Sequence, residues 1–146
     1  MEMHVDHKYL LVYGTLRPCL GTPMGRWLSQ RMQYIGPGHV FGHLFDLGTY
    51  PGLVLDDHEG AKIKVDIFAY FKEYEAALFL KLDKYEGIND QTSDDEYQRV
   101  ITKVYTTQHL LSGWVDVLTG DLSTYLHKKR IICGDYCVYQ NAPRVI

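Results

Sequence analysis

The stretch Tyr9-Leu-Leu-Val-Tyr-Gly-Thr-Leu16 joins an apolar run to a glycine turn near the start of the chain. Its apolar and aromatic residues predict a short buried strand over residues 9–13, and Gly14 predicts a tight turn directly after that strand. A turn of this kind can present several backbone N–H groups to an anion. A plain junction between a strand and a turn has the same pattern, so this segment alone leaves both interpretations open.

Around this stretch, the sequence predicts several strands and one main helix. The alternation of apolar and polar residues over residues 63–70 predicts a half-buried strand, and residues 73–85 have apolar residues at helical spacing. This combination predicts an α+β fold or a small closed barrel. The other predicted elements are a short helix over residues 24–32, two strands within residues 34–55, strands over residues 97–106 and 114–118, and a short mixed tail over residues 131–139 with a loose end.

Length and composition favour one globular domain. The 146 residues, of which 46% are hydrophobic and 23% charged, predict a single domain over residues 1–146. A net charge of −3 argues against a protein that neutralises nucleic-acid phosphates. No segment approaches the roughly 20 apolar residues of a membrane helix, and the polar N-terminus is unlike a signal peptide. We therefore expect neither nucleic acid nor membrane as a partner.

The chain contains 12 tyrosines, which is its unusual compositional feature. Tyrosine favours strands, and its hydroxyl needs a hydrogen-bond partner when the ring is buried. The composition therefore predicts a β structure that contains a polar cavity.

Cysteines and histidines give no pattern of a metal or redox site. The three cysteines, Cys19, Cys133 and Cys137, are an odd number, which predicts free thiols in a reducing cytoplasm and no disulfide framework. The seven histidines are scattered, and no group of His, Cys and Asp has metal-ligand spacing, so we expect no metal. The glycine motifs that bind nucleotide phosphates are missing, so we expect no nucleotide cofactor.

A carboxylate stands near the end of the main helix, in Leu82-Asp-Lys-Tyr-Glu-Gly87. Glu86 follows Leu82 by four residues, so it begins near the buried side of that helix. Partial burial and the negative end of the helix dipole would both raise its pKa, which suits a proton acceptor near neutral pH. A surface carboxylate just before a C-cap glycine has the same spacing, so the spacing does not decide between the two.

Five short segments follow one another over nearly the whole chain: Tyr13-Gly-Thr-Leu16, Tyr50-Pro-Gly52, Leu82-Asp-Lys-Tyr-Glu-Gly87, Tyr97-Gln-Arg99 and Gly134-Asp-Tyr136. Each is weak alone, but in this order they resemble the γ-glutamylcyclotransferase-like family, which includes the AIG2-like and γ-glutamylamine cyclotransferase proteins. The resemblance implies a small mixed β-barrel with flanking helices and a cavity at one end. The tyrosines of these segments, Tyr13, Tyr50, Tyr85, Tyr97 and Tyr136, are expected to frame that cavity.

The resemblance also implies a reaction without a cofactor. The free α-amine of a γ-glutamyl compound attacks its own γ-carbonyl, which releases 5-oxoproline and an amine or amino acid. Glu86 occupies the family's catalytic position, and the residues that would bind substrate are Tyr13, Gly14, Thr15 and Leu16. Tyr97 and Arg99 are expected to support the strand or the site.

The sequence departs from the family pattern in its central strand, where Val65 and Asp66 stand in place of the usual Gly-Glu pair. Val65 adds bulk, and Asp66 keeps a carboxylate on a shorter arm. These departures favour, as an alternative, a catalytically silent module of the same fold that binds a small molecule. A third interpretation is a different amine lyase or transferase that uses Glu86 on a substrate without a γ-glutamyl group.

Overall fold

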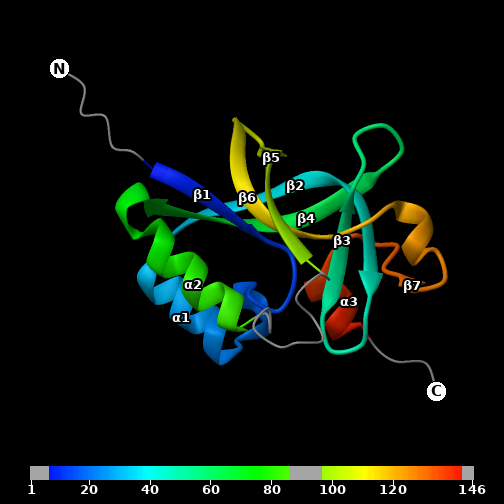
Figure 1. Cartoon of the computed structure of the whole chain (residues 1–146), viewed down its shortest axis with the longest axis horizontal. Helices are drawn as coiled ribbons and strands as arrows, with labels where there is room; N and C mark the ends of the chain where they lie inside the picture. The colour runs from blue at the N-terminus through cyan, green and yellow to red at the C-terminus, as the bar shows by residue number, and fades with distance from the viewer. Residues whose placement is uncertain (1–6, 86–96, 143–146) are drawn as a thin grey trace.

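The computed structural model describes residues 7–85 and 97–142 (Figure 1). Short 3-10 helices lie at Pro18–Leu20, Lys72–Tyr74 and Leu122–Tyr125. The α-helices are α1 (Pro23–Arg31), α2 (Glu75–Tyr85) and α3 (Tyr136–Asn141). The strands are β1 (His7–Val12), β2 (Gln33–Asp46), β3 (Pro51–Leu55), β4 (Ala61–Phe71), β5 (Tyr97–Tyr105), β6 (Leu110–Leu118) and β7 (Lys129–Arg130).

Five of these strands close into a barrel in the order β2-β4-β1-β6-β5. A pairing between His39 of β2 and Tyr105 of β5 completes the ring. Neighbouring strands are antiparallel except β1 and β6, which pair in parallel at Leu10 and Trp114. β3 and β7 pair with β2 outside the ring. The prediction of a small mixed barrel with flanking helices is confirmed.

The seam between β2 and β5 depends on Gly38. A Cβ atom at this position would lie 2.9 Å from the carbonyl oxygen of Tyr105 and 3.0 Å from Cγ2 of Val104. Glycine therefore allows the two strands to approach closely enough to close the barrel.

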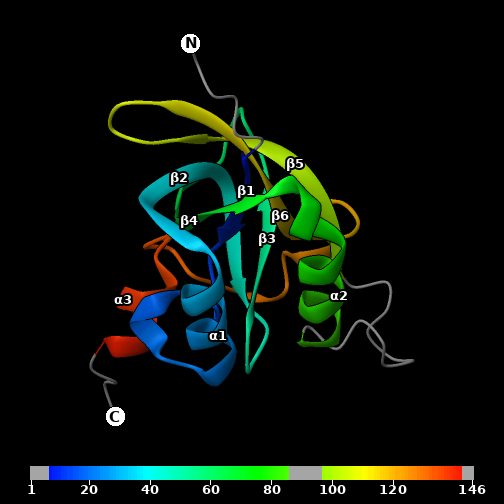
Figure 2. The same cartoon turned by 90° about the vertical axis from the view of Figure 1, so that its left-hand side faces the viewer.

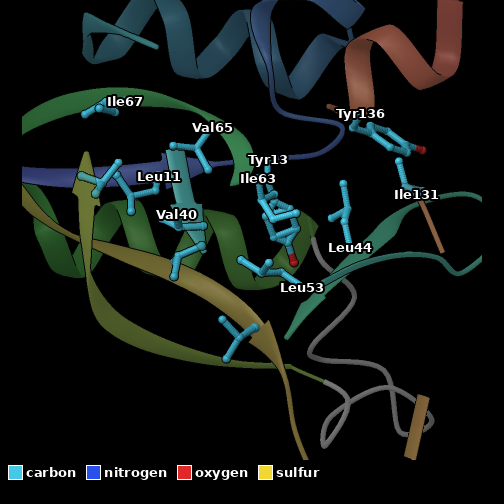
Figure 3. Packing of buried hydrophobic residues seen from close by; sticks show 13 residues of the cluster. Leu11, Tyr13, Val40, Leu44, Leu53, Ile63, Val65, Ile67, Ile131 and Tyr136 are labelled. Carbon is cyan, nitrogen blue, oxygen red and sulfur yellow. The ribbon is translucent and has the colours of Figure 1, made fainter. Parts of the chain in front are cut away.

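Alternate residues of the strands fill the barrel interior, where side chains from different strands point toward one another (Figure 3). Tyr13, just beyond the end of β1, also enters this core, and so does Ile131 from the C-terminal part of the chain. The buried members are Leu11, Tyr13, Val40, Leu44, Leu53, Ile63, Val65, Ile67, Val104, Val115, Val117, Ile131 and Tyr136.

Helices α1 and α2 cover the outer face of β1 and β4 (Figure 2). Leu28 of α1 and Leu78 of α2 pack with Leu10 and Phe68 in a second apolar cluster. Residues 65–70 of β4 are consequently all buried, because the barrel core covers one face and the helices cover the other. The prediction of a half-buried strand is therefore wrong for this part of β4. The alternation of apolar and polar residues indicates one buried face, and here the other face of the strand is covered as well.

The C-terminal part of the described chain is more ordered than the predicted mixed tail. Asp135 accepts a hydrogen bond from the backbone N–H of Val138 (3.2 Å) and caps α3. The tertiary structure also buries Tyr136, the first residue of α3, in the barrel core. A helix of six residues is too short to show a clear apolar period, which is why the sequence pattern did not predict it.

Several strand boundaries differ from the sequence prediction, and the start of β6 differs most. β6 begins at Leu110, four residues before the predicted start at Trp114, and its glycine, Gly113, weakened the strand pattern. A Cβ at Gly113 would lie 2.9 Å from Cδ2 of Leu11, so this glycine lets β6 approach β1. β3, the second of the two strands predicted within residues 34–55, begins at Pro51.

A disulfide joins Cys19, in the 3-10 helix after β1, to Cys137 of α3. The prediction of free thiols is therefore wrong for these two residues, whereas Cys133 is free and exposed. Spacing did not reveal the bond, because the cysteines lie 118 residues apart and only the fold brings them together. The disulfide removes one reason for expecting a reducing compartment, and the cytoplasmic location stays a prediction.

Among the described helices, none is long and apolar enough to cross a membrane.

We expect the Cys19→Ser variant to be less stable than the wild type by roughly 2–5 kcal/mol, because the bond closes a long loop in the unfolded chain. Chemical denaturation without reductant measures the difference, and adding dithiothreitol should bring the wild type to the stability of the variant. Cys133→Ser is the matched control and should leave the stability unchanged. Three free thiols found by mass spectrometry in the non-reduced wild type would contradict the bond.

Candidate active site

The segment Tyr13–Leu16 leaves the end of β1 as a turn, in which the N–H of Arg17 donates to the carbonyl oxygen of Gly14 (3.0 Å). Within the described part of the chain, the N–H groups of Gly14, Thr15 and Leu16 donate to no backbone carbonyl. These donors are free to bind an anionic or carbonyl oxygen, as the anion-binding interpretation of the sequence requires.

A small cavity of about 50 Å³ lies beside this turn. Residues from β1 and the turn form one wall, and segments distant in the sequence form the others. The lining residues are Leu10, Leu11, Val12, Tyr13, Gly14, Thr15, Leu16, Tyr50, Pro51, Leu82, Tyr97 and Asp116.

At the cavity, the segments Tyr13–Leu16 and Tyr50–Gly52 are in direct contact. A Cβ atom on Gly14 would lie only 2.7 Å from Cγ of Pro51, so a side chain at position 14 would displace the proline. The hydroxyl of Tyr97 donates to the carbonyl oxygen of Pro51 (3.0 Å) and helps to fix this wall. Tyr97 therefore supports the site, as expected.

Hydrogen bonds hold the turn from several sides. The hydroxyl of Tyr13 donates to the carbonyl oxygen of Asp116 on β6 (2.8 Å). The Thr22 hydroxyl donates to the carbonyl oxygen of Thr15 (2.8 Å), while Oγ1 of Thr15 lies 2.7 Å from the hydroxyl oxygen of Tyr85. Tyr85 is the last residue of α2, so this contact ties the end of that helix to the turn.

Arg17, the residue directly after the turn, anchors it to the barrel and to α3. Its Nε donates to Oδ2 of Asp66 (2.9 Å) and its Nη1 to Oδ1 of Asp135 (2.8 Å). The side chains of Arg17 and Asp66 are only 6% and 9% exposed. The hydroxyl of Tyr34 donates to Oδ1 of Asp66 (2.7 Å). Burial, and to a smaller extent this hydrogen bond, raises the pKa of Tyr34 to about 12.

Arg99 makes a second ionic network, which attaches α2 to the barrel. Its guanidinium binds both carboxylate oxygens of Asp116 (2.8 and 3.1 Å) and lies 2.8 Å from Oδ1 of Asp83 in α2. The guanidinium also lies over the ring of Phe79, 4.5 Å from its centroid. Burial raises the pKa of Asp116, although Arg99 acts in the opposite direction. Arg99 thus has the supporting role that was expected.

The structure places the predicted site residues as follows. Tyr13, Gly14, Thr15 and Leu16 lie together at the cavity. Glu86, the predicted catalytic residue, lies outside the described residues, as does Gly87, which was predicted to end the helix. α2 is described up to Tyr85.

The five tyrosines of the family segments do not all line the cavity. Tyr13, Tyr50 and Tyr97 do, and Tyr85 reaches its wall through Thr15. Tyr136 lies in the barrel core instead and is not a lining residue.

The two departures in the central strand also lie away from the cavity. Val65 is fully buried in the barrel core, and Asp66 faces Arg17 on the other side of the strand. Sequence reasoning alone could not place these two residues outside the cavity lining. It also did not identify Arg17 and Asp116. Arg17 directly follows the turn and Asp116 lies between two valines, and these positions could have indicated that the two residues support the site.

Among the residues that the structure describes, no group of three or more His, Cys, Asp or Glu side chains is arranged to hold a metal ion.

Residues 10–138 match the sequence profile of the family described as "Gamma-glutamyl cyclotransferase, AIG2-like". The match spans most of the 146-residue chain, and the protein therefore belongs to this family. A comparison with curated proteins finds no match.

Solved structures of other proteins have the same fold. An AIG2-like protein from Mus musculus is 16% identical, with a TM-score of 0.62 over 90% of this chain and 88% of that one. An uncharacterized protein from Pyrococcus horikoshii is 22% identical, with a TM-score of 0.57 over 91% of this chain and 92% of that one. A γ-glutamyl cyclotransferase is 11% identical, with a TM-score of 0.54 over 94% of this chain and 81% of that one. At these identities the structures support the fold.

We expect Arg17→Met to lower the free energy of unfolding by roughly 3–5 kcal/mol, because it leaves the carboxylate of Asp66 buried without its cation. Urea denaturation measures the loss. Arg26→Met is the control, since Arg26 is exposed on α1. Equal stability of the two variants would contradict an anchoring role for Arg17.

The pH dependence of stability should reveal the state of Asp135. Burial alone raises its pKa, but hydrogen bonds from Val138 and Arg17 outweigh burial and lower the pKa below 3.8. A lowered folded-state pKa stabilises the fold above pH 3.8, and this contribution disappears as the pH falls through the lowered value.

We therefore expect the Asp135→Asn variant, whose side chain can still cap α3, to lose less stability than the wild type between about pH 4 and pH 2. Urea denaturation at a series of pH values gives both curves. Curves of identical slope would contradict the assignment.

Proposed function

We propose that this protein is a γ-glutamyl cyclotransferase, which converts a γ-glutamyl compound into 5-oxoproline and a free amine or amino acid. The observation that carries the proposal is the turn beside the cavity, where the N–H groups of Gly14, Thr15 and Leu16 donate to no backbone carbonyl of the residues that the structure describes. The family to which the chain belongs supports the choice of reaction.

The proposed reaction makes modest demands on the protein, because the substrate carries its own nucleophile. The α-amine forms a bond to the γ-carbonyl carbon, and the bond from that carbon to the leaving nitrogen breaks. A proton leaves the attacking amine and a proton reaches the leaving nitrogen. The protein therefore has to fold the substrate back on itself and move a proton.

The turn would bind the glutamyl part of the substrate. N–H donors that are already oriented stabilise a carboxylate or the negative charge that develops on the γ-carbonyl oxygen. The cavity of about 50 Å³ is smaller than the roughly 300–1,000 Å³ of a complete ligand pocket. We infer that it holds only the glutamyl end and that the leaving amine lies outside it.

Glu86 would be the proton acceptor and later the proton donor. Tyr85, which precedes it in the sequence, lies with its hydroxyl oxygen 2.7 Å from Oγ1 of Thr15 in the binding turn. This contact supports a position for Glu86 near the substrate. Asp116 also lines the cavity, but both of its carboxylate oxygens already accept hydrogen bonds from Arg99, so we assign it a structural role although burial raises its pKa.

We expect Glu86→Gln to lower the rate of 5-oxoproline release by a factor of about 10²–10⁴, the usual contribution of one acid–base residue. Release is measured with a panel of γ-glutamyl amines and γ-glutamyl amino acids. Glu59→Gln, which changes an exposed carboxylate in the turn between β3 and β4, is the control and should keep the wild-type rate.

The same panel tests the alternative of a silent binding module. The bulk of Val65 motivated that alternative, and Val65 does not line the cavity. A wild type that binds a panel member, as shown by a raised melting temperature, but releases no 5-oxoproline would favour the binding module. A folded Glu86→Gln variant with full activity would remove Glu86 from the proposed mechanism.

A further inference from the structure

A second and larger cavity lies at the opposite end of β1 from the binding turn. It is lined by the C-terminal end of α1, the N-terminal half of α2 and the end of β4, and we call it the α1–α2 groove. Its volume of about 570 Å³ lies within the roughly 300–1,000 Å³ of sites that bind small organic molecules. The groove shares no lining residue with the cavity at the turn.

Aromatic rings dominate the walls of the groove. Trp27 of α1, Phe71 of β4 and Tyr74, just before α2, all line it. Phe71 and Tyr74 are 45% and 54% exposed, although their ring centroids lie only 6.2 Å apart. Large aromatic side chains that remain exposed side by side indicate a surface suited to binding an apolar or planar group.

Arg31 supplies the charge among the described side chains that line the groove. Arg31, in the last turn of α1, lines the groove, and its guanidinium makes no hydrogen bond or ion pair with a residue that the structure describes. Lys81 of α2 lies with its Nζ 5.5 Å from the centre of the Trp27 ring. Within the described chain, no Asp or Glu lines the groove. Glu75 lies nearby, and its carboxylate already accepts a hydrogen bond from Tyr70 (2.6 Å).

From these observations we infer that the α1–α2 groove binds a planar aromatic anion, a molecule with one or two fused or linked rings and a single carboxylate or sulfonate group. The rings pack against Trp27, Phe71 and Tyr74, and Arg31 pairs with the acid group. This site is separate from the proposed reaction and does not depend on it.

The probe for the test is 8-anilinonaphthalene-1-sulfonate, which has aromatic rings and one sulfonate, with the uncharged N-phenyl-1-naphthylamine as its counterpart. We expect the sulfonate to bind the wild type saturably with one site per chain, as measured by its fluorescence. Arg31→Gln should weaken this binding about tenfold, the effect of losing one charge-assisted hydrogen bond. Arg31→Lys should restore most of the affinity, and the uncharged probe should bind the wild type and Arg31→Gln equally.

Arg26→Gln is the matched control, because Arg26 is exposed on the same helix and does not line the groove. The NMR signals of the two tryptophan indole N–H groups locate the probe. The signal of Trp27 should shift on titration with the probe, whereas the signal of Trp114 on β6 should not. Circular dichroism confirms that each variant is folded. The proposal is overturned by binding that does not saturate, by equal affinity of the wild type and Arg31→Gln, by an equal loss in Arg26→Gln, or by an unchanged Trp27 signal.

Discussion

The place of β1 as a strand in the middle of the barrel wall is the constraint on which the other features depend. β1 pairs antiparallel with β4 on one side and parallel with β6 on the other. Leu11 points into the barrel core, while Leu10 and Val12 lie beneath α1 and α2. A strand that is paired at both edges and covered on both faces has one fixed direction, so the turn that follows it is presented at one definite place.

The rest of the chain then holds that turn. Pro51 packs against Gly14, Tyr85 reaches Thr15, and Arg17 pairs with Asp66 and Asp135. The family segments are short and far apart in the sequence because each supplies one contact to the same place. Backbone N–H groups held in this way are oriented before a ligand arrives, which is what stabilisation of a developing negative charge requires.

The two ends of β1 have different chemistry. The turn at its C-terminal end borders a small cavity with backbone donors. Its N-terminal end lies beside a groove with aromatic walls and with Arg31, which forms no ion pair with a residue that the structure describes. Both sites use α2: Leu82 lines the first, and Ala77 and Leu78 line the second. The ion pairs of Arg99 with Asp83 and Asp116 hold this helix against the barrel.

The sequence by itself determined most of the local elements, and it predicted the strand and the glycine turn within residues 9–16. Apolar patterning predicted a helix at α1 and α2 and a strand within each of β1 to β6, and the order of five short segments indicated the family. Only the tertiary structure decided the closure at Gly38, the burial of Tyr136, the disulfide of Cys19 with Cys137 and the ion pairs of Arg17. Periodicity reports neighbours a few residues apart, but these interactions join residues that become neighbours only when the barrel closes.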